Sequence, residues 1–348
     1  MNEVAHRDAD IYVQILCTSP FLRPDTIHRA IELLSTKDAV FDSVCAVRSE
    51  KQYTWNNSTP GYSLENIPNS VDLPDTIIET MGLYAITREA ALKCQRRIGD
   101  RPHGMIVTPL DAVDINYEDD FVLADMLTTA LRAREKLRLD HLRRHLSSAL
   151  LSDTLDELGL SGQIVRNLHS NFPCNILGRA STLRLRRLEA GEDLRGIYSA
   201  LKSYQTVASG SIIVVENEAS EFAYFGELNA NIALSCGAGG AIIDGHTRDS
   251  EEVKALRFPV FSTGTVCSDV RGRATVDTMN RRIKIQNVEC SPGDLIFGDS
   301  EGVVIIPRDS EREVINKALL RAGNENVIRR GILQGDSIDG LLEQHGEF

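Results

Sequence analysis

The stretch "GELNANIALSCGAGGAIIDGHTRD", Gly226 to Asp249, contains the pattern on which the fold prediction depends. A glycine opens a segment with helical character, a glycine-rich turn follows, and the apolar run of "GAIID" predicts a buried strand. Gly245 permits a tight turn after that strand. We therefore expect Arg248 and Asp249 at the carboxyl end of a sheet strand, where α/β proteins commonly place their ligand sites.

The start of the expected helix adds a second feature to this site. Its first backbone amides have no helical partner and point outward, which makes them a ready anion site. These amides belong to Glu227, Leu228 and Asn229, directly after Gly226. Together with the cation of Arg248 and a carboxylate at Asp249 that suits a hard divalent ion, they fit a 2-oxo acid. An adjacent arginine and aspartate alone would also fit a plain surface salt bridge.

Composition excludes several classes of protein. The chain has 348 residues and a net charge of −12, and its charges are mixed along the sequence. The basic stripe that nucleic-acid binding requires is not visible. No apolar run approaches the roughly 18–20 residues that span a bilayer, and the polar N-terminal segment is unlike a signal peptide, so we expect a cytoplasmic protein without a membrane partner.

Neither cysteines nor histidines form a metal motif. Seven cysteines are scattered without a C-x-x-C pair, so they are expected to be reduced, mostly buried thiols. His141 and His145 stand one helical turn apart without a carboxylate in register, which favours an exposed helix face over a metal site.

The chain divides into two expected domains, residues 1–137 and 138–348. In the first, strand-like and helical segments alternate, which is typical of an α/β domain with a parallel sheet, and Thr54–Asp75 is expected to form a long loop. A helical segment that starts near Tyr117, as one helix or two end to end, joins the domains near Leu137.

The second domain is also expected to be α/β. A strand over "CNILGRASTLRL" is predicted to be interrupted by Gly178, several short strands follow between Arg281 and Pro307, and a last helix spans Ser310–Gly335.

Five motifs in order make the second domain resemble the RraA-like family. They are "LLSDTLDELG", "ILGRASTL", the stretch that opens this section, "FPVFSTG" and "VECSPGDLIFGDSEGVVIIP", and the resemblance spans Leu142 to Gly335. That family includes class II 4-hydroxy-4-methyl-2-oxoglutarate aldolases and oxaloacetate decarboxylases. The resemblance implies an α/β sandwich, a small 2-oxo acid substrate, and a homotrimer or homohexamer.

The resemblance also implies roles for individual residues. Asp249 would ligate Mg²⁺ or Mn²⁺, with water completing the shell, and Arg248 would bind the keto oxygen and stabilise the enolate. The substrate carboxylate would be held by the amides of Leu228 and Asn229, with the acidic Glu227 beside them. Glu325, in the last helix, is the candidate that would reach the site of a neighbouring subunit.

Two kinds of function remain open for this domain. An enzyme would cleave a 4-hydroxy-2-oxo acid to pyruvate, or decarboxylate oxaloacetate through the same enolate. The family also contains a non-catalytic branch, a protein inhibitor of ribonuclease E, which lacks the metal aspartate after the arginine. The presence of Asp249 favours the enzyme over a regulatory or binding protein.

The first domain resembles the later part of the acylneuraminate cytidylyltransferases, over about Asp8 to Leu131. The segments that carry the resemblance are "VQILCTSPFLRPDTIHRAI", "DSVCAV", "IETMGLYAIT" and "VDINYEDDFVLAD". The family's nucleotide loop lies upstream of where this chain begins, and its paired metal aspartates fall on Asp114 and Asn116. The resemblance therefore implies a partial nucleotidyltransferase-like α/β domain. As an alternative, the whole chain would act on a 2-keto-3-deoxy sugar acid as a cytidylyltransferase.

Overall fold

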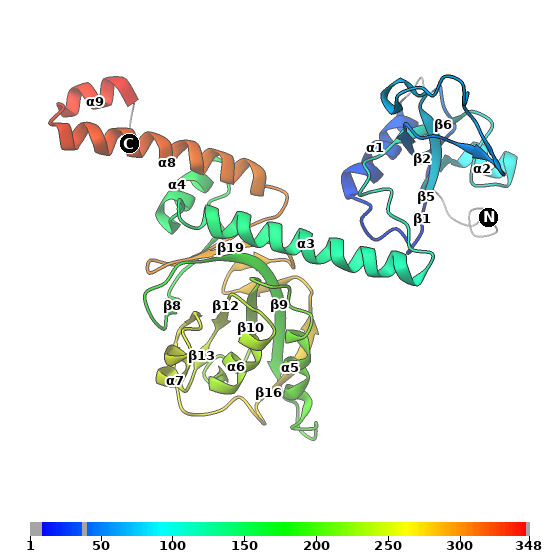
Figure 1. Ribbon diagram of the computed structural model, residues 1–348. Helices are drawn as coiled ribbons and strands as arrows, with labels where there is room; N and C mark the ends of the chain where they lie inside the picture. The colour runs from blue at the N-terminus through cyan, green and yellow to red at the C-terminus, as the bar shows by residue number, and fades with distance from the viewer. Residues whose placement is uncertain (1–8, 37–39, 346–348) are drawn as a thin grey trace. The chain divides into compact units, whose positions relative to one another are not determined.

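The computed structural model describes residues 9–36 and 40–345 and divides into two compact units (Figure 1). Unit 1 runs to Thr129 and unit 2 begins at Ala130. The division therefore lies inside the long helix α3 (Glu118–Leu142), which also contains the boundary expected at Leu137. None of the helices within the described residues combines the length and the apolar character needed to cross a lipid bilayer.

Unit 1 is a small α/β unit with a four-stranded sheet in the order β1-β5-β2-β6. Its elements are β1 (Ile11–Ile15), α1 (Pro24–Ser35), β2 (Ser43–Glu50), β3 (Trp55–Asn56), β4 (Thr59–Pro60), the 3-10 turn η2 (Ser70–Asp72), β5 (Thr76–Thr87), α2 (Arg88–Cys94) and β6 (Pro102–Ile106).

The sheet of unit 1 is mixed, so the prediction of a parallel sheet is wrong. β5 pairs antiparallel with both β1 and β2, and only β2 and β6 run parallel. A parallel neighbour needs a crossover of a dozen or more residues, usually a helix. Between β2 and β5 the chain instead forms the short β3–β4 hairpin and the turn η2, and then returns beside the strand it left.

Unit 2 contains the expected helix and strand of Gly226–Asp249 as α6 and β12. Its elements after α3 are α4 (Ser148–Glu157), β7 (Ile164–Val165), β8 (His169–Ser170), β9 (Ile176–Arg187), η3 (Gly196–Tyr198), α5 (Ser199–Tyr204), β10 (Ile212–Asn217), β11 (Ala223–Phe225), α6 (Glu227–Ser235), β12 (Gly240–Asp244), β13 (His246–Thr247), α7 (Ser250–Ala255), β14 (Val260–Ser262), β15 (Gly264–Thr265), β16 (Ala274–Met279), β17 (Ile283–Ile285), β18 (Val288–Cys290), β19 (Leu295–Gly298), β20 (Val303–Ile306), α8 (Glu311–Gln334) and α9 (Ile338–His345).

The long strand β9 organises the nine-stranded sheet of unit 2. One of its edges pairs in parallel with β10, which continues in parallel to β12 and β14. The other edge pairs antiparallel with β19 over its first residues and with β16 over its last. Strands of both directions therefore meet in one sheet, and the α/β architecture expected for this domain is confirmed.

Gly178 does not interrupt β9, contrary to the prediction. The strand is continuous from Ile176 to Arg187. A Cβ at Gly178 would lie 2.3 Å from the carbonyl oxygen of Gly210, so the glycine allows a neighbouring turn to approach the strand. Glycine in a strand marks such a close approach as readily as it marks a break.

Helices pack on one face of this sheet, and the β17–β18 hairpin packs on the other. Leucines of α3 and α4 pack with α8 against β9, β19 and β20, while α5, α6 and α7 cover β9, β10 and β12 further along the same face. Along β10, Ile213 and Val215 belong to the core under α5 and α6, whereas Ile212 and Val214 belong to a separate core that includes the β17–β18 hairpin. Burial on both faces explains why the central strands are continuous apolar runs.

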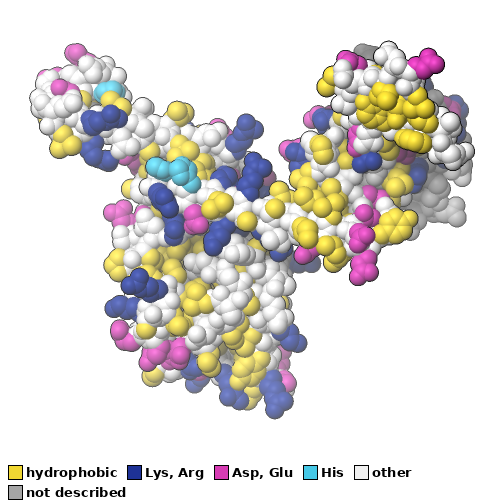
Figure 2. All heavy atoms as spheres, viewed as in Figure 1, with side chains coloured by type: hydrophobic (Ala, Val, Ile, Leu, Met, Phe, Trp, Pro, Cys, Tyr) yellow, Lys and Arg dark blue, Asp and Glu magenta, His cyan; other side chains and the backbone are white. Residues whose placement is uncertain are grey.

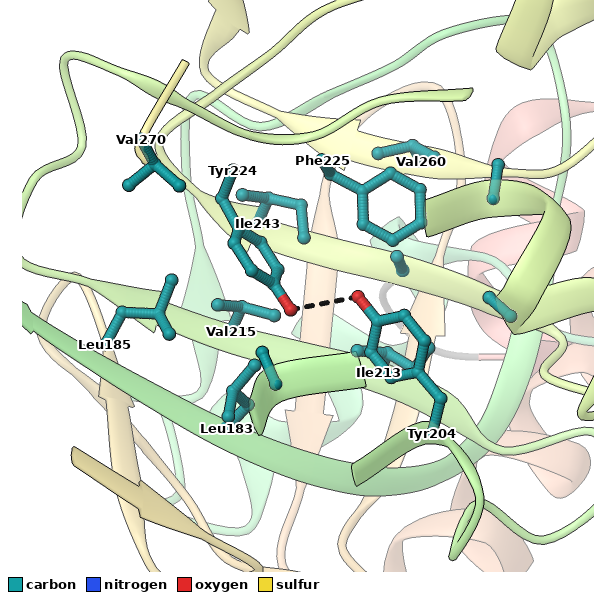
Figure 3. Close-up of a cluster of buried hydrophobic side chains, with 14 of the residues drawn as sticks. Leu183, Leu185, Tyr204, Ile213, Val215, Tyr224, Phe225, Ile243, Val260 and Val270 are labelled. Carbon is teal, nitrogen blue, oxygen red and sulfur yellow. Dashed lines mark hydrogen bonds between the residues drawn. The ribbon is translucent and has the colours of Figure 1, made fainter. Parts of the chain in front are cut away.

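A hydrogen-bonded tyrosine pair stands inside the core beneath α6 (Figure 3). The hydroxyl oxygens of Tyr204 and Tyr224 lie 2.9 Å apart, and the side-chain amide of Asn229 donates to the Tyr204 hydroxyl at 3.3 Å. Burial raises the pKa of Tyr204 to about 12. Since Tyr224 is in β11 and Asn229 is in the first turn of α6, this chain of bonds ties the helix start to the sheet.

A buried carboxylate organises the end of unit 1. Asp111 is 1% exposed and accepts hydrogen bonds from the guanidinium of Arg23, at 2.7 Å, and from the hydroxyls of Thr26 and Thr108. Burial by itself raises the pKa of Asp111, but the hydrogen bonds from Arg23 and Thr108 outweigh it and lower the pKa to about 2.

The substitution Asp111→Asn should destabilise unit 1 by about 2 kcal/mol at neutral pH. Because the pKa is depressed in the folded state, this contribution is complete above the unfolded value near ~4 and is lost as the pH falls toward 2. Urea unfolding between pH 7 and pH 2.5 measures it. Asp75→Asn, at an exposed site, is the control. An unchanged pH slope of stability in Asp111→Asn would contradict this account.

The substitution Tyr204→Phe should lower the stability of unit 2 by roughly 1–3 kcal/mol, because it leaves the Tyr224 hydroxyl buried without its partner. Amide hydrogen exchange in the first turn of α6 should become faster, since Asn229 loses its acceptor. Thermal unfolding and exchange mass spectrometry measure the two effects. Tyr198→Phe, at a residue that is 48% exposed, should change neither. Equal behaviour of the two variants would show that the tyrosine pair contributes nothing.

Candidate active site

The candidate site lies where three short parallel strands end. β11, β13 and β15 form a separate three-stranded sheet, and the chain continues from β11 into α6 and from β13 into the Arg248–Asp249 turn. The backbone N–H of Arg248 donates to the carbonyl of Phe225 at 2.9 Å, which fixes the turn beside the start of α6. The expectation that Arg248 and Asp249 follow a buried strand agrees with this geometry, since Ile242 and Ile243 in β12 are fully buried.

Gly226 sits at the closest approach of these two segments. A Cβ at this position would lie 2.5 Å from Oδ2 of Asp249 and 3.1 Å from Cγ of Arg248. Its backbone is extended, so space and not conformation requires the glycine. Across this contact, the backbone N–H of Glu227 donates to Oδ2 of Asp249 at 3.2 Å. The start of α6 therefore does bind a carboxylate here, the one that the chain itself supplies.

Asp249 has an unusual backbone conformation. Its φ of 54° and ψ of 43° are left-handed, and it stands at the N-cap position of α7 without making a side-chain cap to that helix. A left-handed residue other than glycine costs of order 1 kcal/mol and persists only where the surroundings impose it. The conformation turns the carboxylate away from its own helix and toward the start of α6.

Arg248 is held between two carboxylates. Its Nη1 lies 2.7 Å from Oδ2 of Asp269, and its Nε lies 3.6 Å from Oδ2 of Asp249. All three side chains are between 37% and 41% exposed, so they remain accessible from solvent. Sequence reasoning did not identify Asp269, because only the bridge between Ala223 and Asp269 brings its loop to this place.

The residues expected to bind a substrate carboxylate form the first turn of α6. The first hydrogen bond of this turn runs from the N–H of Ala230 to the carbonyl of Gly226, so the amides of Leu228 and Asn229 precede it and lack helical acceptors. The side chain of Leu228 is 72% exposed, and Glu227 is exposed beside it. The structure thus brings Gly226, Leu228 and Asn229 together with the Arg248 turn.

A cavity of about 220 Å³ opens beside Arg248. Its walls carry hydroxyl and imidazole groups from several strands, among them Thr247, Ser262, Thr265 and His169. Polar groups of this kind can orient a small oxygen-rich molecule next to the guanidinium.

Glu325 does not join this group within one chain. It lies in α8 between Arg321 and Arg329, with N–O distances of 3.8 and 3.9 Å, and it lines a different cavity of about 530 Å³ with residues of α4. Its role in the site of another subunit stays a prediction.

Metal-ligand clusters are not found in the described ranges, 9–36 and 40–345. No three histidine, cysteine or acidic side chains gather there as a metal site. The rings of His141 and His145 meet edge to face, 5.0 Å apart. In unit 1, the side-chain amide of Asn116 donates to Asp114 at 2.8 Å, so the amide occupies one carboxylate oxygen of the position that the cytidylyltransferase resemblance assigns to a metal.

Comparison with known proteins shows which family this chain resembles. Residues 148–305 match the family described as RraA-like, Aldolase/RraA. An uncharacterized protein of Methanocaldococcus jannaschii is 33% identical over 167 residues, which cover 48% of this chain and 77% of that protein. A relative from Halalkalibacterium halodurans, named as a candidate 4-hydroxy-4-methyl-2-oxoglutarate aldolase, is 29% identical over 54% of this chain and 86% of its own length.

Two further similarities concern length and fold. The DlpA protein of Legionella pneumophila is 29% identical over 57% of this chain, but the chain spans only 32% of that protein. A solved structure of an uncharacterized protein from Pseudomonas syringae pv. tomato matches with a TM-score of 0.53 and 28% identity, covering 59% of this chain and 92% of that one. The matched family region lies entirely within unit 2. On these grounds, the chain belongs to the RraA-like family.

Proposed function

We propose that unit 2 is a divalent-metal-dependent aldolase that cleaves a 4-hydroxy-2-oxo acid and releases pyruvate. The observation that carries the proposal is the contact across Gly226, which joins the Arg248–Asp249 turn to the first amides of α6. A guanidinium, a carboxylate and free backbone amides stand within one small region there. The relative named as a candidate aldolase supports the same chemistry.

Each group has a distinct task in this proposal. The amides of Leu228 and Asn229 bind the substrate carboxylate, because a helix start attracts anions. Arg248 donates hydrogen bonds to the ketone oxygen, and Asp269 fixes the direction of its guanidinium through the 2.7 Å ion pair. A preoriented cation is most effective where negative charge develops during the reaction.

The bond changes follow from the substrate. The proton of the C4 hydroxyl leaves, the C4–O bond becomes a carbonyl, and the C3–C4 bond breaks. Its electron pair forms the enolate of pyruvate, whose oxygen remains beside Arg248, and C3 is then reprotonated. A water held by a glutamate is the proposed proton acceptor. We propose that the glutamate that holds this water is Glu325 of a neighbouring copy of the chain, in a trimer or hexamer, since within one chain Glu325 lines another cavity.

The residues present fit Mg²⁺ or Mn²⁺ bound by a single protein carboxylate. Asp249 uses Oδ2 for its contacts with Glu227 and Arg248, its side chain is 41% exposed, and only oxygen ligands are on offer. Mg²⁺ usually retains several waters and is held by one or two carboxylates, so a cage of three side chains is not required. Such an ion, when bound, supplies Lewis acidity to the ketone and carboxylate oxygens.

Two other functions are tested by the same experiments. Decarboxylation of oxaloacetate produces the same enolate, so Arg248 would serve both reactions. A regulatory protein without catalysis would release no pyruvate from any substrate. For unit 1 we propose a partial nucleotidyltransferase-like domain, and Asn116 in place of a carboxylate makes CTP-dependent pyrophosphate release from a 2-keto-3-deoxy sugar acid unexpected.

With Mg²⁺ or Mn²⁺, the protein should release pyruvate from 4-hydroxy-2-oxo acids, measured by coupling to lactate dehydrogenase. Arg248→Lys and Asp249→Asn should each lower kcat/KM by roughly 10²–10³-fold, because each removes charge or geometry used in the transition state. Chelation by EDTA should abolish activity, and added Mn²⁺ should restore it.

The matched controls are Arg282→Lys, whose side chain is 70% exposed, and Asp309→Asn, at another exposed position. Both should retain full activity, and all four variants should assemble as the unsubstituted chain does. Pyruvate release that survives Asp249→Asn would exclude the proposed metal ligand, and no release from any substrate would favour the regulatory alternative.

The substitution Asp269→Asn should lower kcat by about tenfold while KM changes little. It removes the charge that orients Arg248 but leaves the amides of α6 in place to bind the substrate carboxylate. Steady-state kinetics separate the two constants. A change in KM alone would show that Asp269 acts in binding and not in orienting the guanidinium.

A further inference from the structure

A second cavity lies at the amino ends of the central parallel strands of the nine-stranded sheet. It has a volume of about 360 Å³ and is bounded by the carboxyl half of α3 and by the amino ends of β9, β10 and β12. These three strands are parallel, and β12 leads at its carboxyl end through β13 to the Arg248 turn. The cavity therefore shares no residue with the Arg248 site.

Its walls are partly apolar. Leu139 of α3 and Leu177 of β9 are buried side chains that also belong to the core under α4 and α8. Leu131 and Ile176 extend this surface along the cavity. A volume above about 300 Å³ with apolar walls and a few polar groups is typical of a small-molecule pocket.

The other walls are polar turns. The segment Ala208–Ser211 lines the cavity with two serines and with Gly210, whose φ is 81°. The aliphatic stem of Lys136 packs over this glycine, 3.5 Å from where a side chain would begin. The stem of this exposed lysine therefore lies along the cavity wall, while its charged end stays accessible to solvent.

Two cations at the cavity lack acidic partners. Arg132 and Lys136 stand four residues apart on one face of α3, and neither forms an ion pair with another described residue. The nearby Glu135 is fully used, because its two oxygens bind Arg138 and Arg179. Like charges at this spacing destabilise a helix, and a bound anion would offset that repulsion.

Two more cations of the cavity wall already have acidic partners. A bound anion is therefore expected at Arg132 and Lys136 and not at these two. Arg143 lies 3.4 Å from Asp140 and donates to the carbonyl of Asn175. Arg179 is held by Glu135 and Glu311. Figure 2 shows dark-blue basic side chains gathered over this half of α3 with hydrophobic ones between them.

We propose that this cavity is a binding site for a small amphipathic organic anion. Its carboxylate or phosphate group would lie between Arg132 and Lys136, and its apolar body would pack against Leu139 and Leu177. The combination of an unpaired cationic pair with an apolar floor selects this class over inorganic ions, which would leave the floor without contact, and over neutral apolar molecules, which would leave the cations unpaired.

Ligand-observed nuclear magnetic resonance titrations of the full chain test this site. The probes are phenyl phosphate, benzoate and the neutral benzamide, which share a ring and differ in charge. The two anions should bind at least tenfold more tightly than benzamide, and the ratio of their dissociation constants distinguishes a phosphate site from a carboxylate site. Equal affinity for all three probes would overturn the proposal.

Variants locate the binding. Arg132→Gln/Lys136→Gln should weaken both anions at least tenfold, whereas the matched pair Arg134→Gln/Arg312→Gln, at exposed positions outside the cavity, should leave affinity unchanged. Arg248→Gln should also leave it unchanged. Loss of binding in Arg248→Gln would place the anion in the candidate active site and overturn the proposal. Unchanged binding in Arg132→Gln/Lys136→Gln would overturn it as well. Circular dichroism checks that all variants are folded.

Discussion

The lack of a side chain at Gly226 is the constraint on which the candidate site depends. Only a bare α-carbon lets the Arg248–Asp249 turn close onto the start of α6, with the Asp249 carboxylate accepting from the Glu227 amide. The parallel register of β11 and β13 brings the two segments to that distance. The tyrosine pair beneath α6 then holds the helix start in place through Asn229. The contacts that pack the core therefore also fix the geometry of the candidate site.

Local signals predicted much of unit 2. The glycine before α6, the buried Ile242 and Ile243, and the turn at Gly245 each follow from the chemistry of a few neighbouring residues, and the structure contains them. Longer-range contacts were not accessible in this way. Asp269 reaches Arg248 through a bridge to a distant strand, and Tyr204 meets Asn229 only because α5 and α6 pack together.

Two errors have the same origin. Gly178 was expected to break a strand, and segments of unit 1 were expected to form a parallel sheet. In the first case the glycine makes room for the carbonyl of Gly210, a partner 32 positions along the chain. In the second, the direction of β5 depends on how Thr54–Asp75 folds back. Sequence patterns report the burial of a residue better than they report which distant segment buries it.

The left-handed backbone conformation of Asp249 lowers the stability of the fold, whereas its carboxylate is needed for the proposed reaction. Glycine would adopt these dihedral angles without strain, and so would relieve about 1 kcal/mol that aspartate incurs. A substitution that stabilises the fold at this position therefore removes the carboxylate. Only selection for the chemical function of that carboxylate would retain the aspartate. A lineage released from the reaction would be free to lose this aspartate early, while keeping the surrounding architecture intact.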